Sequence, residues 1–187
     1  MDENTVIHRA REGDNGAFHQ LYRTHSERIY RLAWRYTRSQ TDAEDVMQET
    51  FVKAFRQIHR FNGDNPAAFT SWLGRICVNC SIDFLRKQKR RHSGNTVSLD
   101  DLTADPVDGG RSPEQTAVRE EFVRQVAEAA GQLSAKQRVV FDLRYSQHHT
   151  IAEIADLLDC SENAVKTHLS RAVKKLRSLL IPVWSEK

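Results

Sequence analysis

The sequence predicts an all-α fold: two small helical domains joined by a flexible acidic linker, the C-terminal domain containing a helix-turn-helix. Three observations support this. Apolar residues recur at helical spacing along most of the chain, capping patterns precede several of these stretches, and no stretch alternates convincingly between apolar and polar residues as a strand would. Periodicity is lost over residues 92–112, so we place the domains at residues 1–91 and 113–187, with the linker between them.

Composition narrows the class of protein. The 187 residues suffice for one domain or two small ones, and 39% hydrophobic residues allow modest cores. The net charge of only +3 hides two basic clusters separated by an acidic segment. The three cysteines, an odd number, provide no disulfide framework and suit a reducing compartment. No apolar run approaches the roughly 18 residues of a membrane span, and the polar N-terminus shows no signal peptide, so we expect a cytoplasmic protein.

Three helices are expected before residue 60. The first runs from Val6 to Glu12 and ends at Gly13. The second has one apolar stripe, formed by Ala17, Phe18, Leu21, Tyr22, Ile29, Ala33 and Tyr36. The third is predicted to begin at a capping box made by Thr41 and Glu44.

The third helix is predicted to have two unlike faces. The buried face is almost entirely apolar: Ala43, Val46, Met47, Thr50, Phe51, Ala54, Phe55 and Ile58. The opposite face is mostly polar: Asp45, Gln48, Glu49, Val52 and Arg56. Together with Asp42 and Glu44, its acidic residues raise the idea of a metal-dependent nuclease, but no DxD pair or metal-spaced histidine accompanies them. We interpret this face as solvated or as docking a partner.

A polar loop over residues 60–69 leads into the fourth helix, which we expect to begin with Asn65 as cap and Pro66 in the first turn and to end near Arg91. The helix ends in RKQKRR, five cations in six residues. Such a cluster is also typical of a solvated helix terminus. Here it follows Trp72, Asn79 and the polar loop, and single-stranded nucleic acid needs this combination of stacking surface, hydrogen bonds and cations. A core role for Trp72 and a merely exposed Asn79 are the alternatives.

Capping patterns also mark the first two helices of the C-terminal domain. The patterns are Ser112-Pro113 with Gln115, and Ser134 with Gln137. These helices are expected to end near residues 131 and 145.

Residues 150–177 are predicted to form the helix-turn-helix. Thr150 and Glu153 make a capping box, Asp159 stands where the turn needs a left-handed residue, and Ser161 starts the second helix. The inward faces carry Ile151, Ile154, Ala155 and Leu158, then Val165 and Leu169. The outer face carries donors suited to base edges and phosphates in a major groove: Lys166, Thr167, Ser170, Arg171, Lys174 and Lys175. An ordinary antiparallel helix pair with a solvated basic face is the alternative.

No catalytic or metal constellation is found in the sequence. Cys77 and Cys80 form a CxxC without a second pair at zinc spacing, so we interpret them as core or half-buried thiols. Cys160 is expected in the core, and His148 and His149 in a loop. Without a Ser-His-Asp arrangement or a phosphate-cradling loop, we expect no enzyme activity, metal or cofactor.

Taken together, these segments resemble a known family. Residues 13–61, which contain DAEDVMQETF, residues 69–91 and residues 133–177 are similar to the bacterial sigma-70 superfamily. The small two-domain form, the extracytoplasmic-function (ECF, group 4) sigma factors, fits best, and the resemblance covers nearly the whole chain apart from the linker and both tips. It implies transcription initiation, in which a sigma factor binds core RNA polymerase and directs it to promoter DNA.

The resemblance also implies roles for individual residues. The helix with Asp45, Gln48 and Glu49 would dock on the polymerase clamp helices, and the polymerase flap is a further expected contact. The first domain would open the −10 promoter element and capture flipped bases through Asn62, Gly63, Asp64, Asn65 and Asn79. The cations Arg86, Lys87, Arg90 and Arg91 would hold the DNA backbone. The second domain would read the −35 element as duplex through Lys166, Thr167, Ser170 and Arg171.

Three departures from the usual family pattern concern local loop conformation. Glycine is usual where His148 stands and common where Asp159 stands, and proline is usual where Ser134 stands. Family members are commonly held inactive by an anti-sigma factor, sometimes near the membrane, so we expect such a partner. A free-standing dimeric helix-turn-helix regulator is the alternative function, but it leaves the Asp45 face and RKQKRR unexplained.

Overall fold

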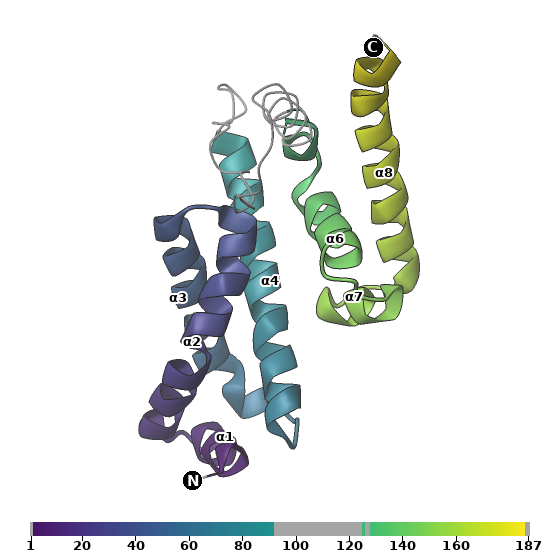
Figure 1. Ribbon diagram of the computed structural model, residues 1–187. Helices are drawn as coiled ribbons and strands as arrows, with labels where there is room; N and C mark the ends of the chain where they lie inside the picture. The colour runs from purple at the N-terminus through teal and green to yellow at the C-terminus, as the bar shows by residue number, and fades with distance from the viewer. Residues whose placement is uncertain (1, 92–124, 126–127, 186–187) are drawn as a thin grey trace, which may run out of the picture. The chain divides into compact units, whose positions relative to one another are not determined.

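The computed structural model describes residues 2–91, 125 and 128–185, and over these residues it contains helices and no strand (Figure 1). The all-α prediction is therefore confirmed. The elements are α1 Glu3–Arg11, α2 Asn15–Thr37, α3 Gln40–Gln57, the short 3-10 helix η1 Ile58–Arg60, α4 Pro66–Arg91, α6 Ala135–Tyr145, α7 Ile151–Leu157 and α8 Glu162–Ser185. Contacts divide the chain into two compact units, the first built mainly from α1 to α4 and the second from α6 to α8.

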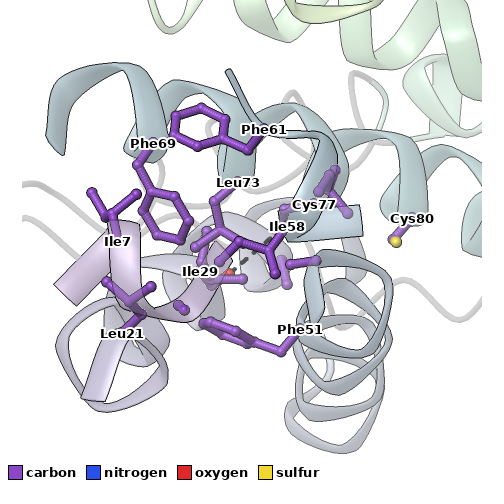
Figure 2. Close-up of a cluster of buried hydrophobic side chains, with 14 of the residues drawn as sticks. Ile7, Leu21, Ile29, Phe51, Ile58, Phe61, Phe69, Leu73, Cys77 and Cys80 are labelled. Atoms are coloured by element: carbon purple, nitrogen blue, oxygen red, sulfur yellow. Dashed lines mark hydrogen bonds between the residues drawn. The ribbon is translucent and has the colours of Figure 1, made fainter. Parts of the chain in front are cut away.

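The first unit is organised around one apolar cluster. Helix α2 packs against α1 on one side and α3 on another, and α4 contributes Phe69, Leu73 and Cys77 to the same core (Figure 2). Phe69 lies within 5.6 Å of the ring of Phe61 and is fully buried. The thiol of Cys77 donates a long hydrogen bond of 3.8 Å to the Ile29 carbonyl. This cluster fixes the positions of α3 and α4, which carry the first unit's candidate residues.

Local chemistry explains the helix starts of the first unit. Gly13 takes a φ of +94°, which ends α1 as predicted. Asp14 then caps α2 by accepting from the Ala17 N–H at 3.0 Å, and it also accepts from Arg9 Nε at 2.9 Å. These hydrogen bonds, that from the Ala17 backbone first, hold the pKa of Asp14 below its ordinary value. Asn65 caps α4 as predicted, accepting from the Ala68 N–H at 2.8 Å.

Two predictions for α3 are wrong. The cap is Ser39, whose hydroxyl accepts from the Asp42 N–H at 3.4 Å, and not Thr41. The reason is that Arg38 turns the chain in a left-handed conformation, φ 56°, so the next helix begins at once. Phe55, expected in the core, is 50% exposed, because Phe51 and Ala54 already fill the contact with α2. Its ring instead packs at the surface against Phe18, 5.1 Å away.

Among its described residues, the second unit has a core of aliphatic side chains. Helix α6 packs against α8, and the fully buried residues are Val139, Val140, Leu143, Ile154, Val165 and Ala172. Ser134 and Gln137 form the predicted capping box at the start of α6, which ends at Tyr145 as expected. The pattern at Ser112-Pro113 and the linker at residues 92–112 lie outside the described residues. Within the part of the chain that is described, no helix is long and apolar enough to cross a membrane.

Candidate nucleic-acid interface

The predicted helix-turn-helix is formed by α7, a short turn and α8. Thr150 and Glu153 make a reciprocal capping box: the Thr150 N–H donates to Glu153 Oε2 at 2.7 Å, and the Glu153 N–H donates to Thr150 Oγ1 at 3.2 Å. The hydrogen bond from the Thr150 backbone is the main cause that lowers the pKa of Glu153. The capping prediction is therefore confirmed, and it fixes where α7 begins.

The turn has the predicted geometry. Asp159 takes the left-handed conformation, with φ of 48°, and the Ser161 hydroxyl accepts from the Ala164 N–H at 3.2 Å to start α8. Ile154 and Val165 are fully buried, so the inward faces of α7 and α8 meet as expected. Cys160 is half-buried, not in the core as predicted, because it lies at the open end of this turn. The motif is thus stabilised by the caps at Thr150 and Ser161 and by its buried apolar residues.

All six outer-face candidates of α8 are exposed: Lys166, Thr167, Ser170, Arg171, Lys174 and Lys175. They differ in how they are held. Lys166 lies 3.5 Å from Glu162 one turn earlier, and the Thr167 hydroxyl donates to the Asn163 carbonyl at 2.8 Å. Lys175 donates to the Gln132 carbonyl at 2.9 Å, so its ammonium ties α8 to the segment before α6. The face as a whole presents cations and hydroxyl groups to solvent.

The loop before α7 is backbone-constrained. His148 takes a φ of 59°, a conformation that favours glycine. Neighbouring bonds hold it there: Arg144 Nη1 donates to the His149 carbonyl at 3.0 Å, and the His149 N–H donates to the Leu143 carbonyl at 3.0 Å. This position, where the family resemblance leads us to expect glycine, is thus left-handed in this chain.

In the first unit, the loop over residues 62–65 has exposed polar side chains and a tightly packed backbone at Gly63. Asn62, Asp64 and Asn65 are exposed, and the Asn65 amide donates to Asp64 Oδ1 at 2.9 Å. A side chain at Gly63 would overlap the Phe61 ring and lie 2.9 Å from Ala68 Cβ, so only glycine fits there. The loop therefore displays polar groups in a shape that its own packing fixes.

The remaining candidates of the first unit lie along α4. Trp72, Asn79 and Arg86 follow at seven-residue spacing and share one stripe, which Arg90 extends. Asn79, Arg86, Lys87, Arg90 and Arg91 are exposed. Trp72 is half-buried, with its ring 5.2 Å from that of Phe61 and 5.6 Å from that of Phe69. The stripe from residue 72 to residue 90 spans about 27 Å at 1.5 Å per residue, with an aromatic ring near the polar loop and cations at the far end.

The polar face of α3 is exposed as predicted: Asp45, Gln48, Glu49, Val52 and Arg56 are all accessible. Glu49 pairs with Lys53 at 3.0 Å. Val52, which the prediction placed on this face, is 49% exposed, and Phe55, which it placed in the core, is 50% exposed, so the face has an apolar centre. The spacing contained a signal, since Phe55 lies seven residues after Gln48 and three after Val52 and thus on the same stripe. A rim of charges around exposed apolar side chains is typical of a protein-docking surface.

The cysteines are suited to packing. Cys77 and Cys80 are buried, and burial raises the pKa of Cys77 to about 12 and also raises that of Cys80, so neither is a thiolate at neutral pH. Over the residues that the structure covers, no group of three His, Cys, Asp or Glu side chains could hold a metal ion.

Family models match both units. The model described as Sigma-70 region 2 matches residues 21–91, and the model described as Sigma-70, region 4 matches residues 124–176. Among relatives, the ECF RNA polymerase sigma factor SigX of Bacillus subtilis (strain 168) is 32% identical, over 86% of this chain and 81% of SigX. The ECF RNA polymerase sigma-E factor of Escherichia coli (strain K12) is 30% identical, over 98% of this chain and 96% of its own.

Solved structures with the same fold include two complexes. The structure of CnrH in complex with the cytosolic domain of CnrY matches with a TM-score of 0.56 and 28% identity, covering 96% of this chain and 97% of that one. The sigma factor RpoE of Bartonella quintana, solved with the anti-sigma factor NepR, matches with a TM-score of 0.53 and 24% identity, over 87% of this chain and 96% of RpoE. The second likeness concerns the fold alone.

Proposed function

Because the chain belongs to the extracytoplasmic-function RNA polymerase sigma factors of the sigma-70 family, we infer that its three exposed faces divide promoter recognition and polymerase binding between them. The protein is a sigma factor: it binds core RNA polymerase and promoter DNA and directs transcription initiation. It acts as an initiation factor, and the phosphodiester chemistry belongs to the polymerase. This role places it in the cytoplasm with the transcription machinery.

We assign the exposed α3 face to polymerase. Its charged rim around Val52 and Phe55 supports docking on a protein surface, and the family resemblance identifies that surface as the clamp helices. A free-standing dimeric regulator, the alternative function, has no use for this face. The coexistence of the α3 face with a complete helix-turn-helix in one chain is the observation that carries the proposal.

We assign the α4 stripe and the loop over residues 62–65 to the opened −10 element. Amides and carboxylates of the loop supply hydrogen bonds to base edges, the half-buried Trp72 offers an aromatic ring for stacking, and Arg86 and Arg90 supply cations for the DNA backbone. Asn79 lies between the ring and these cations on the same stripe. Since melting costs about 1.4 kcal/mol of stacking per base step, polymerase must share the work of holding the bubble.

We assign the outer face of α8 to the −35 element as duplex. Lys166, Thr167, Ser170 and Arg171 occupy the first turns of the second helix of the motif, the part that enters the major groove in helix-turn-helix proteins. Lys174 lies further along and suits backbone phosphates. Lys175, which is bonded to the Gln132 carbonyl, would contribute positioning more than a base contact.

We also propose that a regulatory protein controls access to these faces, as an anti-sigma factor does in the family. The related CnrH has been solved with the cytosolic domain of CnrY bound, which supports a protein partner for this fold. Affinity purification of the native protein under several growth conditions would identify such a partner, and its absence under all of them would contradict this part of the proposal.

Run-off transcription tests the function. Core polymerase alone should give no specific transcript from the protein's own promoter, and addition of the protein should give one. Asp45→Arg should weaken binding to core polymerase by about tenfold or more, because a cation replaces an acid at the docking rim. Glu27→Arg, the same charge reversal at a residue of α2 whose side chain is 80% exposed, is the matched control and should leave binding unchanged. Self-association on a palindromic site without any polymerase requirement would instead favour the dimeric regulator.

A further inference from the structure

Next to Arg171 on the outer face of α8 lie two basic side chains that the assignments above do not use, Lys136 and His168. We call Lys136, His168 and Arg171 the cationic corner. The bond from Lys175 Nζ to the Gln132 carbonyl, 2.9 Å, sets which turns of the two helical segments lie side by side. Lys136 comes four residues after Gln132, and Arg171 and His168 come four and seven residues before Lys175. These separations are one to two helical turns, counted from the bonded pair Gln132 and Lys175. Because α6 packs against α8, Lys136 lies beside His168 and Arg171.

The Nδ1 atom of His168 has no hydrogen-bond partner among the described residues. The His168 ring is half-buried, and Nδ1 is shielded from solvent. The charged groups that act on the ring are Lys136 from α6 and Arg171 from α8, both cations. Desolvation first, and then these two cations, lower the pKa of His168 below its ordinary 6.5. The free protein therefore keeps a neutral imidazole between two positive charges.

A bound anion would offset the positive charges of Lys136 and Arg171 beside the His168 ring. Lys136 is half-buried and Arg171 is exposed, so the corner is open to solvent on the side of the predicted DNA face. In helix-turn-helix complexes the second helix enters the major groove, and its cations at the edge of the groove also reach the backbone phosphates. The anion that this position meets is thus a backbone phosphate. A phosphate beside the ring would favour the imidazolium, which reverses the effect of the two cations.

We propose that Lys136, His168 and Arg171 form a site for a DNA backbone phosphate, and that His168 takes up a proton when the phosphate binds. The inference rests on the proposed duplex recognition by α8. The direction of the pH dependence follows from the proton uptake. Because the complex holds more protons than the free protein, the affinity for duplex rises as pH falls from 8 towards 6. A phosphate contact carries no sequence information, and the effect is therefore the same on promoter and unrelated duplex.

Fluorescence anisotropy of the full-length chain with a labelled mixed-sequence 20-base-pair duplex, at fixed low salt and several pH values, tests the proposal. A rise of one unit in the pKa of His168 on binding raises the affinity by at most about tenfold. Because the pKa of the free protein lies below 6.5, we expect a rise of a few-fold between pH 8 and pH 6. His168→Gln should lose most of this dependence, and Lys136→Ala should bind several-fold more weakly at every pH. His59→Gln, which removes an exposed histidine of the first unit, is the control and should behave as the unchanged protein.

A second measurement does not depend on how the variants fold. The His168 ring protons of the unaltered protein, followed by NMR with and without the duplex, should titrate at higher pH when the duplex is bound. Full pH dependence in His168→Gln, or a His168 titration that the duplex leaves unmoved, would overturn the proposal. Failure to direct transcription from a promoter would instead count against the sigma-factor assignment. The transcription assay and the His168 titration are independent measurements, so failure of the function and failure of the phosphate site are distinguishable.

Discussion

The two units share one kind of secondary structure but bury very different cores. In the first unit, Phe69 and Leu73 are at most 1% exposed within a continuous cluster, and Tyr36 is 2% exposed. In the second, the fully buried side chains among the described residues are aliphatic. The aromatic pair Phe141 and Tyr145 has ring centroids 4.7 Å apart, and Tyr145 is 53% exposed. Over the described residues, the first unit therefore buries larger side chains than the second.

The surfaces differ in the same sense. The loop over residues 62–65 and the stripe of α4 present amides, a half-buried aromatic ring and cations, which suit individual unpaired bases. The second presents cations and hydroxyl groups on one regular helix, which suits a duplex groove of regular shape. A rigid core is needed where the ligand is irregular, and a small capped motif suffices where the ligand itself is regular.

The largest expected effect removes the aromatic centre of the first core. Phe69→Ala should destabilise the first unit by about 3–5 kcal/mol, because it leaves a cavity between Phe61, Trp72 and His25. Hydrogen exchange read by mass spectrometry should show faster exchange throughout α1 to α4. Phe141→Ala, at a half-buried ring of α6, is the counterpart and should cost the second unit less. Equal loss of protection across both units in Phe69→Ala would mean that they form one cooperative core.

The next effect concerns the groove face of the second unit. Lys166→Ala should weaken recognition of the −35 element by about 1–3 kcal/mol if the ammonium contacts a base edge. Arg31→Ala is a close control, because both cations are exposed and both pair with a glutamate one turn earlier, at 3.5 Å for Lys166 and 3.6 Å for Arg31. Competition between promoter and mismatched duplexes for holoenzyme measures the expected loss of −35 recognition in Lys166→Ala. Unaltered promoter choice in Lys166→Ala would refute the base contact.

The helix starts show how far the sequence could predict this fold. Caps at Asn65, Ser134 and Thr150 were predictable because donor and acceptor are three residues apart and the geometry is local. The start of α3 was not, because it depends on where α2 stops, and that is decided by the left-handed Arg38.

The faces of α3 and α8 show the same limit for the candidate site. The exposure of Asp45 and Lys166 follows from helical periodicity alone. The exposure of Phe55 does not, because a helix with two apolar stripes does not reveal which one its neighbours cover. The closeness of Lys136 to His168 depends on how α6 and α8 are aligned, and no spacing within either helix contains that information.

A smaller effect tests whether the second unit depends on its caps. Thr150→Ala removes the hydroxyl that accepts from the Glu153 N–H and should destabilise the second unit by about 1 kcal/mol. Ser39→Ala, at the cap of α3, should cost the first unit less, because its hydrogen bond is longer, 3.4 Å against 3.2 Å, and because packing holds α3 in place. Urea denaturation followed by circular dichroism, with hydrogen exchange to separate the units, measures both. A larger loss for Ser39→Ala would reverse the comparison.

The smallest effect distinguishes backbone strain in the two units. His148 and Arg38 both take left-handed conformations, with φ of 59° and 56°. A left-handed residue other than glycine costs about 1–2 kcal/mol, and the greater freedom of glycine in the unfolded chain offsets about half of the gain from replacing it. His148→Gly should therefore stabilise the second unit by about 0.5 kcal/mol, since the His148 side chain is exposed. Arg38→Gly should not stabilise the first unit, because the Arg38 side chain is half-buried and its removal loses buried surface. His148→Ala separates the causes: it removes the same ring but keeps Cβ, so a gain equal to that of His148→Gly would assign the strain to the side chain and not to the backbone.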